Sequence, residues 1–153
     1  MLSLFGILIL RLTTHVMVLV QTHLHILDWG FTIFHLLFTL FCVFGWIFKK
    51  TRILNLVTVL ITGFSWFGLG IWYGFGFCPL TSWHWKVLRK LEVSPLPDSY
   101  IKFLIDRLFN TDINEIFIDN MVLMVFFGAF SASVIYNLKD YNNKLKQKEK
   151  QQP

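Results

Sequence analysis

Two long apolar runs joined by a short basic turn constrain this chain more than any other feature. The first run extends from Leu24 to Phe48 and the second from Ile53 to Phe77, with "KKTR" between them. Each run exceeds the ~20 residues that an α-helix needs to cross the hydrocarbon core of a bilayer. Because the connection is so short, the two helices must run antiparallel. The sequence therefore predicts a membrane-spanning helical hairpin.

A third apolar run completes an all-α, polytopic membrane bundle. It covers about residues 113–138, and the spacing of Asp112 and Glu115 at its start is that of a capping box. The chain is 55% hydrophobic and only 15% charged, more apolar surface than a soluble domain of 153 residues can bury. Residues 24–138 are thus expected to form a single transmembrane helical domain.

The segment between the second and third spans, residues 78–112, predicts two short amphipathic surface helices. "TSWHWKVLRKL" follows Pro79, with Thr81 or Ser82 as its expected N-cap. In "PDSYIKFLIDRLF" the apolar side chains share one helix face, namely Ile101, Leu104, Ile105 and Leu108. These helices are expected to lie on the membrane or to cap the bundle.

The apolar N-terminal extension, residues 1–23, allows three interpretations. Arg11 and His15 would be costly inside a span. No cationic segment or small-residue cleavage site marks a signal peptide. A fourth span, an interfacial extension and translation from too early a start, with Met17 as the alternative, all stay open.

The cations predict the orientation. Lys49, Lys50 and Arg52 lie in the turn, and five further lysines lie in the tail, residues 139–153. The positive-inside rule places the 49–52 turn and the tail in the cytoplasm and the 78–112 loop outside. The polar tail is expected to be frayed or disordered. The lipid bilayer is the expected partner and nucleic acid is not, because the cations lie at span ends and in the tail.

Depth along the helices can be estimated from the rise of ~1.5 Å per residue. Cys42 is expected ~10 Å from the inner face and Cys78 at the outer end of its helix, so no disulfide joins them. His35 and Trp66 are both expected ~21 Å above the turn. We therefore expect these two rings to face each other, directly or through Ser65 or a water molecule.

The candidate polar cluster consists of six residues near the expected outer surface: Asp28, His35, Trp66, Cys78, Thr81 and His84. Asp28, His35 and His84 could outline a polar path or a loose metal site. Haem is disfavoured because the second and third spans contain no histidine. No catalytic residue, metal site or cofactor is predicted.

Small residues on two spans predict close helix packing. Gly63, Gly70 and Gly74 share one face of the second span, and Gly128 and Ala132 are four residues apart in the third. Such faces let helices approach closely in a membrane. Packing of the second span on the third is expected, and dimerisation is the alternative.

Two stretches carry a family resemblance. "HLLFTLFCVFG", from His35 to Gly45, and "CPLTSWHWKVLRKL", from Cys78 to Leu91, resemble a bacterial membrane-protein family known as domain of unknown function 2784. The resemblance covers about residues 28–138. It implies a small helical protein of the bacterial inner membrane without an assigned activity. Many relatives place a glutamate shortly after CPLT and a histidine at the position of Asn55, and this chain has neither.

Two functions from different classes follow. The first is a non-enzymatic structural or accessory subunit that contacts other membrane-protein subunits, since few ionisable residues lie in the spans. The alternative is a small membrane enzyme or metal- or redox-binding protein with an outer-face site around Asp28, Cys78 and His84. No nucleophile–base spacing supports that alternative. A transporter would need an internal repeat or broken helices, which the sequence does not display.

Overall fold

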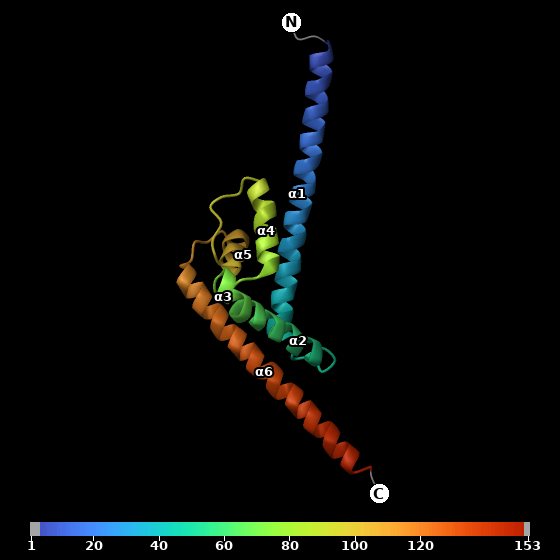
Figure 1. Cartoon of the computed structure of the whole chain (residues 1–153). Helices are drawn as coiled ribbons and strands as arrows, with labels where there is room; N and C mark the ends of the chain where they lie inside the picture. Colours follow the sequence, from blue (N-terminus) through green and yellow to red (C-terminus); the bar gives the residue numbers. More distant parts are fainter. Residues whose placement is uncertain (1–3, 152–153) are drawn as a thin grey trace.

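The computed structural model describes residues 4–151, and every regular element within them is a helix (Figure 1). The helices are α1 (Leu4–Phe44), α2 (Arg52–Gly63), a π-helical turn (Phe64–Leu69), α3 (Gly70–Tyr73), α4 (Pro79–Lys90), α5 (Tyr100–Phe109) and α6 (Glu115–Glu149). Three helical segments are long and apolar enough to cross a membrane: Arg11–Phe44, Arg52–Tyr73 and Glu115–Glu149. The predicted three-span helical bundle, with two short helices between the second and third spans, is confirmed.

The N-terminal extension is part of the first helix. α1 runs without interruption from Leu4 to Phe44 and projects well beyond the other helices at its N-terminal end (Figure 1). Within the described residues, 4–23 therefore do not form a separate fourth helix. The predictions for residues 1–3 concern a part of the chain that the structure does not describe.

The first span ends at Phe44, four residues earlier than expected. Asn55 of α2 donates its side-chain amide to the carbonyl oxygens of Phe41 (2.7 Å) and Cys42 (3.2 Å). The last carbonyls of a helix lack intrahelical partners. Asn55 supplies a partner for the Cys42 carbonyl and a second one for the Phe41 carbonyl, which also accepts from the Gly45 amide, so the helix can end inside the packed hairpin.

The second span is shorter than expected and its chain turns back on itself. The helix ends at Tyr73, and Gly74 (φ 100°) and Gly76 (φ 79°) reverse the backbone in a conformation that favours glycine. Ser65 then donates to the carbonyl oxygen of Phe77 at 2.7 Å. Cys78 thus lies beside the middle of the second span, and the prediction that it sits at the outer end is wrong.

The two cysteines are consequently not at opposite membrane faces. Both are free thiols, and Cys42 lies 3.9 Å from the hydroxyl of Thr62, one turn before Ser65. The depth estimate failed because it assumed a straight helix up to residue 77.

The two predicted short helices, α4 and α5, are present, but the N-cap of α4 and the buried face of α5 differ from the predicted ones. α4 begins at Pro79, with Cys78 extended before it as a residue preceding proline prefers, so Thr81 and Ser82 are not its cap. α5 buries Tyr100 and Leu104, while Leu108 is exposed. The buried face of α5 is therefore rotated from the predicted one.

α6 begins and ends differently from expectation. Its N-cap is Asn114, whose side chain accepts from the Phe117 amide, while Glu115 accepts from the Ser99 amide. The helix continues to Glu149, so the predicted frayed tail is helical as far as that residue. Arg52 anchors this part of α6 through an ion pair with Asp140 at 2.9 Å.

α2 packs against α6, as the small-residue pattern predicted; the predicted Gly63 takes part, but the small residues on α6 differ from the predicted ones (Figure 1). A Cβ on Gly63 would lie 3.3 Å from the Phe126 ring, so Gly63 faces α6. A Cβ on Gly128 would meet nothing within 4 Å. The buried small residues of α6 are Ala129 and Ser133, one position beyond the predicted pair Gly128 and Ala132.

Candidate functional site

α1 presents three polar side chains on one face where α4 packs against it. Asp28, Thr32 and His35 are 4%, 2% and 9% exposed. The spacing of four and three residues places them in a single row along the helix. Thr32 donates its hydroxyl to the Asp28 carbonyl oxygen at 2.8 Å. The side chains of α4 and α5 that form the rest of the site contact this row.

His84 of α4 connects this row to α5. Its Nε2 lies 2.8 Å from Asp28 Oδ1, and its Nδ1 lies 2.8 Å from the hydroxyl oxygen of Tyr100. The imidazole has no exposed surface and stacks on Phe31 with the ring centroids 5.3 Å apart. One histidine thus joins three helices.

Arg107 of α5 completes the site. Its guanidinium binds both Asp28 oxygens, with Nη1 2.6 Å from Oδ1 and Nη2 2.8 Å from Oδ2. The same group lies over the Trp29 ring, 4.6 Å from its centroid. His35 stacks on Tyr100 with the ring centroids 3.8 Å apart. We name these six residues the Asp28 cluster: Asp28, Thr32, His35, His84, Tyr100 and Arg107.

The electrostatics of the Asp28 cluster favour one arrangement of protons. Burial lowers the pKa of His84 below its ordinary value, although the hydrogen bond to Asp28 acts in the opposite direction. Burial also raises the pKa of the Tyr100 phenol. The hydrogen bond to Asp28 raises the pKa of Arg107. A neutral His84 then donates from Nε2 to the Asp28 carboxylate and accepts at Nδ1 from the Tyr100 hydroxyl.

In this arrangement Asp28, His84, Tyr100 and Arg107 bind one another through hydrogen bonds, and His35 joins the cluster through its ring stacking on Tyr100. A carboxylate, an imidazole and a hydroxyl in series are also the parts of a catalytic triad. In a triad, however, the second ring nitrogen faces a reacting group that substrate can reach. Here the group on the second ring nitrogen is the Tyr100 hydroxyl, and both Tyr100 (6% exposed) and His84 (0%) are buried between helices, so the series lacks the open side that a triad presents to its substrate.

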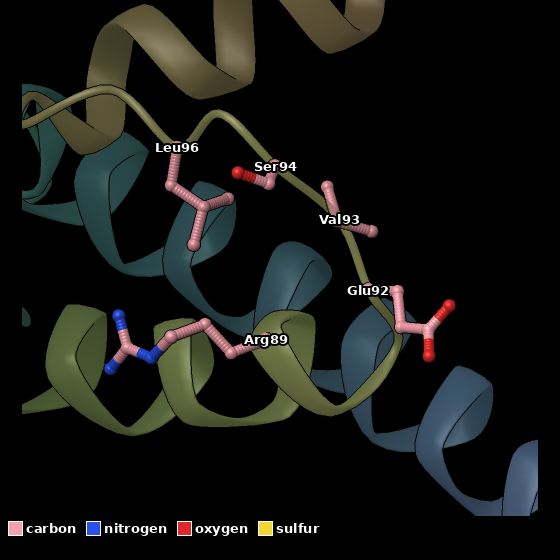
Figure 2. A pocket seen from close by; sticks show the side chains of 5 residues that line it. All are labelled: Arg89, Glu92, Val93, Ser94 and Leu96. Carbon is pink, nitrogen blue, oxygen red and sulfur yellow. The ribbon is translucent and has the colours of Figure 1, made fainter.

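A surface hollow lies elsewhere. Figure 2 shows it at the C-terminal end of α4, lined by Arg89, Glu92, Val93, Ser94 and Leu96. None of these residues belongs to the Asp28 cluster. Among the described residues, no group of three histidine, cysteine or acidic side chains is placed to hold a metal ion.

The structure brings together three of the six candidate residues, namely Asp28, His35 and His84. Trp66 instead packs on Phe126, with the ring centroids 4.9 Å apart. His35 faces Tyr100 and Ser65 binds the Phe77 carbonyl, so the expected His35–Trp66 contact is wrong.

Cys78 and Thr81 stay outside the Asp28 cluster. Cys78 is a half-buried free thiol before α4, and Thr81 lies half-buried in the first turn of that helix. Neither is a hydrogen-bond partner of Asp28 or His84.

Thr32, Tyr100 and Arg107 were not among the sequence candidates. A signal for Arg107 existed, because an aspartate within an apolar run needs a cation partner. Tyr100, Phe103 and Arg107 also share one face of α5. The sequence could not select Arg107 over the other loop cations, since that choice depends on how α5 folds back against α1.

The sequence matches a family of proteins of unknown function (DUF2784) over residues 25–138. Comparison with curated proteins and with solved structures gives no match. The matched region contains both α1–α2 packing at Asn55 and the whole Asp28 cluster. The chain therefore belongs to this family of proteins of unknown function.

Proposed function

We propose that the protein is a non-enzymatic structural or accessory subunit of the bacterial inner membrane. The observation that carries this proposal is the closure of the Asp28 cluster. Its central groups are almost fully buried, His84 at 0% and Asp28 at 4% exposed, and they bind one another. A substrate could reach them only if α4 and α5 moved away from α1.

The chemistry of the Asp28 cluster supports a positioning role. A buried ion pair adds little net stability over a well-packed apolar core, but removing one partner costs several kcal/mol. Such a pair discriminates strongly against misplaced helices, because any other arrangement leaves Asp28 or Arg107 unpaired. The cluster thus fixes α4 and α5 at one position on α1.

The proposed orientation has the turn at residues 49–52 and the tail in the cytoplasm, with the segment 78–112 outside. The cations of the turn and tail support it. In intact cells, a membrane-impermeant amine reagent should label the exposed Lys86 and Lys90 of α4 and spare Lys49 and Lys50 until the cells are permeabilised. Peptide mass spectrometry reads both pairs in one sample. Labelling of Lys49 or Lys50 in intact cells would reverse the orientation.

The accessory role is tested by purification from native membranes in a mild detergent. We expect a membrane protein of fixed stoichiometry to co-purify, and to be lost in Asp28→Asn, which weakens the position of α4 and α5. The exposed control Asp98→Asn should retain it. Purification of the wild-type chain without any such protein contradicts the proposal.

A second candidate is a membrane enzyme or metal- or redox-binding protein with a site around Asp28, Cys78 and His84. One observation favours it, the Asp28–His84–Tyr100 series described above. Elemental analysis separates the two candidates. Stoichiometric zinc or iron that disappears in His84→Ala would favour the second, and a metal-free wild-type protein would favour the first.

A further inference from the structure

One exposed face of α1 carries a mainly apolar heptad pattern from Ile9 to Phe44. Every seventh residue from Ile9 onward lies on this face: Ile9, Val16, His23, Gly30, Leu37 and Phe44. Four of these six side chains are large and apolar, and all six positions are exposed. We call them the a positions of the α1 stripe.

A second series follows three residues after each a position. These are the d positions of the α1 stripe: Leu12, Leu19, Ile26, Ile33 and Leu40. All five are large, apolar and between 44% and 67% exposed. Alternating steps of three and four residues repeat every 3.5 residues on average, which is the spacing of a coiled-coil seam.

The α1 stripe points away from the rest of the chain. Asp28, which faces α4 and α5, is two residues from both Ile26 and Gly30, or about 200° around the helix. His35 has the same relation to Ile33 and Leu37. The stripe and the Asp28 cluster therefore occupy opposite sides of α1, and no described element of the chain covers the stripe.

Lipid alone does not account for the α1 stripe. α1 has 41 residues, which gives a length of about 60 Å. A hydrocarbon core is ~30 Å thick, and even a tilt of 40° leaves α1 about 45 Å along the membrane normal. The other two spans pack near the C-terminal half of α1 (Figure 1). The stripe from Ile9 to Val16 then lies beyond the core even at that tilt, and exposed apolar side chains there are stabilised by a protein partner.

Gly30 provides a second, independent indication. Glycine inside a helix costs about 1 kcal/mol relative to alanine. Nothing in the chain requires it here, because a Cβ on Gly30 would meet no atom within 4 Å. Its location on the stripe fits an interface where a small residue allows another helix to approach closely.

We propose that α1 pairs along this stripe with α1 of a second copy of the chain, as a parallel two-stranded coiled coil. A helix with the same heptad pattern is the complementary surface, and two copies inserted with one topology are necessarily parallel. Ile9 and Val16 at a with Leu12 and Leu19 at d favour two strands. This inference does not depend on the accessory role proposed above.

His23 is the one polar side chain at an a position. Its Nδ1 lies 2.7 Å from the Leu19 carbonyl oxygen, which leaves Nε2 as its remaining polar atom. A single polar residue at an a position fixes register and the number of strands. In the parallel dimer the two His23 rings face each other and hold the helices in register.

Cysteine cross-linking in native membranes tests the dimer. In a chain carrying Cys42→Ser and Cys78→Ser, we compare Val16→Cys on the stripe with Val18→Cys off it. The two valines are similarly exposed, at 54% and 62%. Oxidation should give disulfide-linked dimer in at least about tenfold higher yield for Val16→Cys, since a disulfide needs Cα atoms within about 7 Å. Leu19→Cys, at the next d position, and Gln21→Cys, off the stripe, repeat the comparison three residues further along α1.

A size measurement gives an independent readout. Gly30→Leu should convert the detergent-solubilised dimer to monomer without loss of helical circular dichroism, because the monomer has room for the side chain. Gly128→Leu, at an equally open site on α6, should remain dimeric. Equal yields for Val16→Cys and Val18→Cys, a cross-link to a different protein, or a dimeric Gly30→Leu would each overturn the proposal.

Discussion

Arg107 holds both carboxylate oxygens of Asp28, at 2.6 and 2.8 Å, across a sequence separation of 79 residues. The two groups come from α5 and α1, and His84 of α4 shares one of the same oxygens. Planar, two-point binding of this kind is specific to arginine, because lysine offers a single ammonium group. One carboxylate is therefore the shared partner of side chains from two short helices.

Arg107→Met is expected to lower the free energy of unfolding by about 3 kcal/mol, because it leaves the Asp28 charge without its main partner. Arg107→Lys should restore only part of the loss. Thermal unfolding in detergent, followed by circular dichroism, measures the effect. Arg89→Met removes an exposed arginine from the neighbouring helix and should change little. If Arg107→Met and Arg89→Met had equal effects on the free energy of unfolding, the stabilising role of Arg107 would be contradicted.

The Asp28 cluster should also make stability depend on pH. Burial lowers the folded-state pKa of His84 below the ordinary value of 6.5. The stabilisation from neutral His84 is then complete above pH 6.5 and is lost as the pH falls through the lowered pKa. The midpoint of thermal unfolding should fall on acidification below about pH 6.5, and less steeply in His84→Gln. The exposed His25→Gln should keep the wild-type slope.

The number of spans and the hairpin that joins the first two were predictable, because both depend on the length of each apolar run in the sequence. The length of an apolar run reports a span directly, so "KKTR" and its two flanking runs identified the hairpin. The predictions that were wrong concern the depth of residues near a helix end, because that depth depends on where the helix stops. Cys78 was misplaced because Gly74 and Gly76 reverse the chain, which glycines permit but do not require.

The site was half predictable for a similar reason. Asp28, His35 and His84 could be selected from the sequence because they are polar residues in or beside apolar runs. Tyr100 and Arg107 resemble ordinary residues of an amphipathic surface helix, and only the docking of α5 onto α1 and α4 gives them their partners. Trp66 illustrates the opposite error, since equal depth on paired helices does not ensure that two rings share a face.

Asp140 is expected to hold the C-terminal part of α6 in place. Its carboxylate accepts two hydrogen bonds from Arg52 Nη1, and the guanidinium of Arg52 lies 4.7 Å from the Tyr136 ring centroid. Asp140→Asn should cost about 1 kcal/mol, as for a partly exposed pair. Hydrogen exchange should accelerate in residues 138–149 and stay unchanged in α4. Asn143→Asp, one turn further along, serves as the control and should leave both regions protected.

The close approach of Asn55 to Gly45 leads to the last prediction. A Cβ at residue 45 would lie 2.6 Å from the Phe41 carbonyl oxygen and 2.8 Å from the Asn55 side-chain nitrogen. Gly45→Ala must therefore displace the amide that caps α1, and it should destabilise the protein by about 1–3 kcal/mol.

Two comparisons identify the cause of the Gly45→Ala effect. Gly128→Ala, at an open helical site, should be neutral or stabilising by up to about 1 kcal/mol. Asn55→Ala removes the same capping amide, so the double variant with Gly45→Ala should lose less than the sum of the two single losses. Chemical unfolding of the wild type, the two single variants and the double variant in one detergent measures the cycle. If the two losses were strictly additive, the role of Gly45 would not be to make room for the Asn55 side chain.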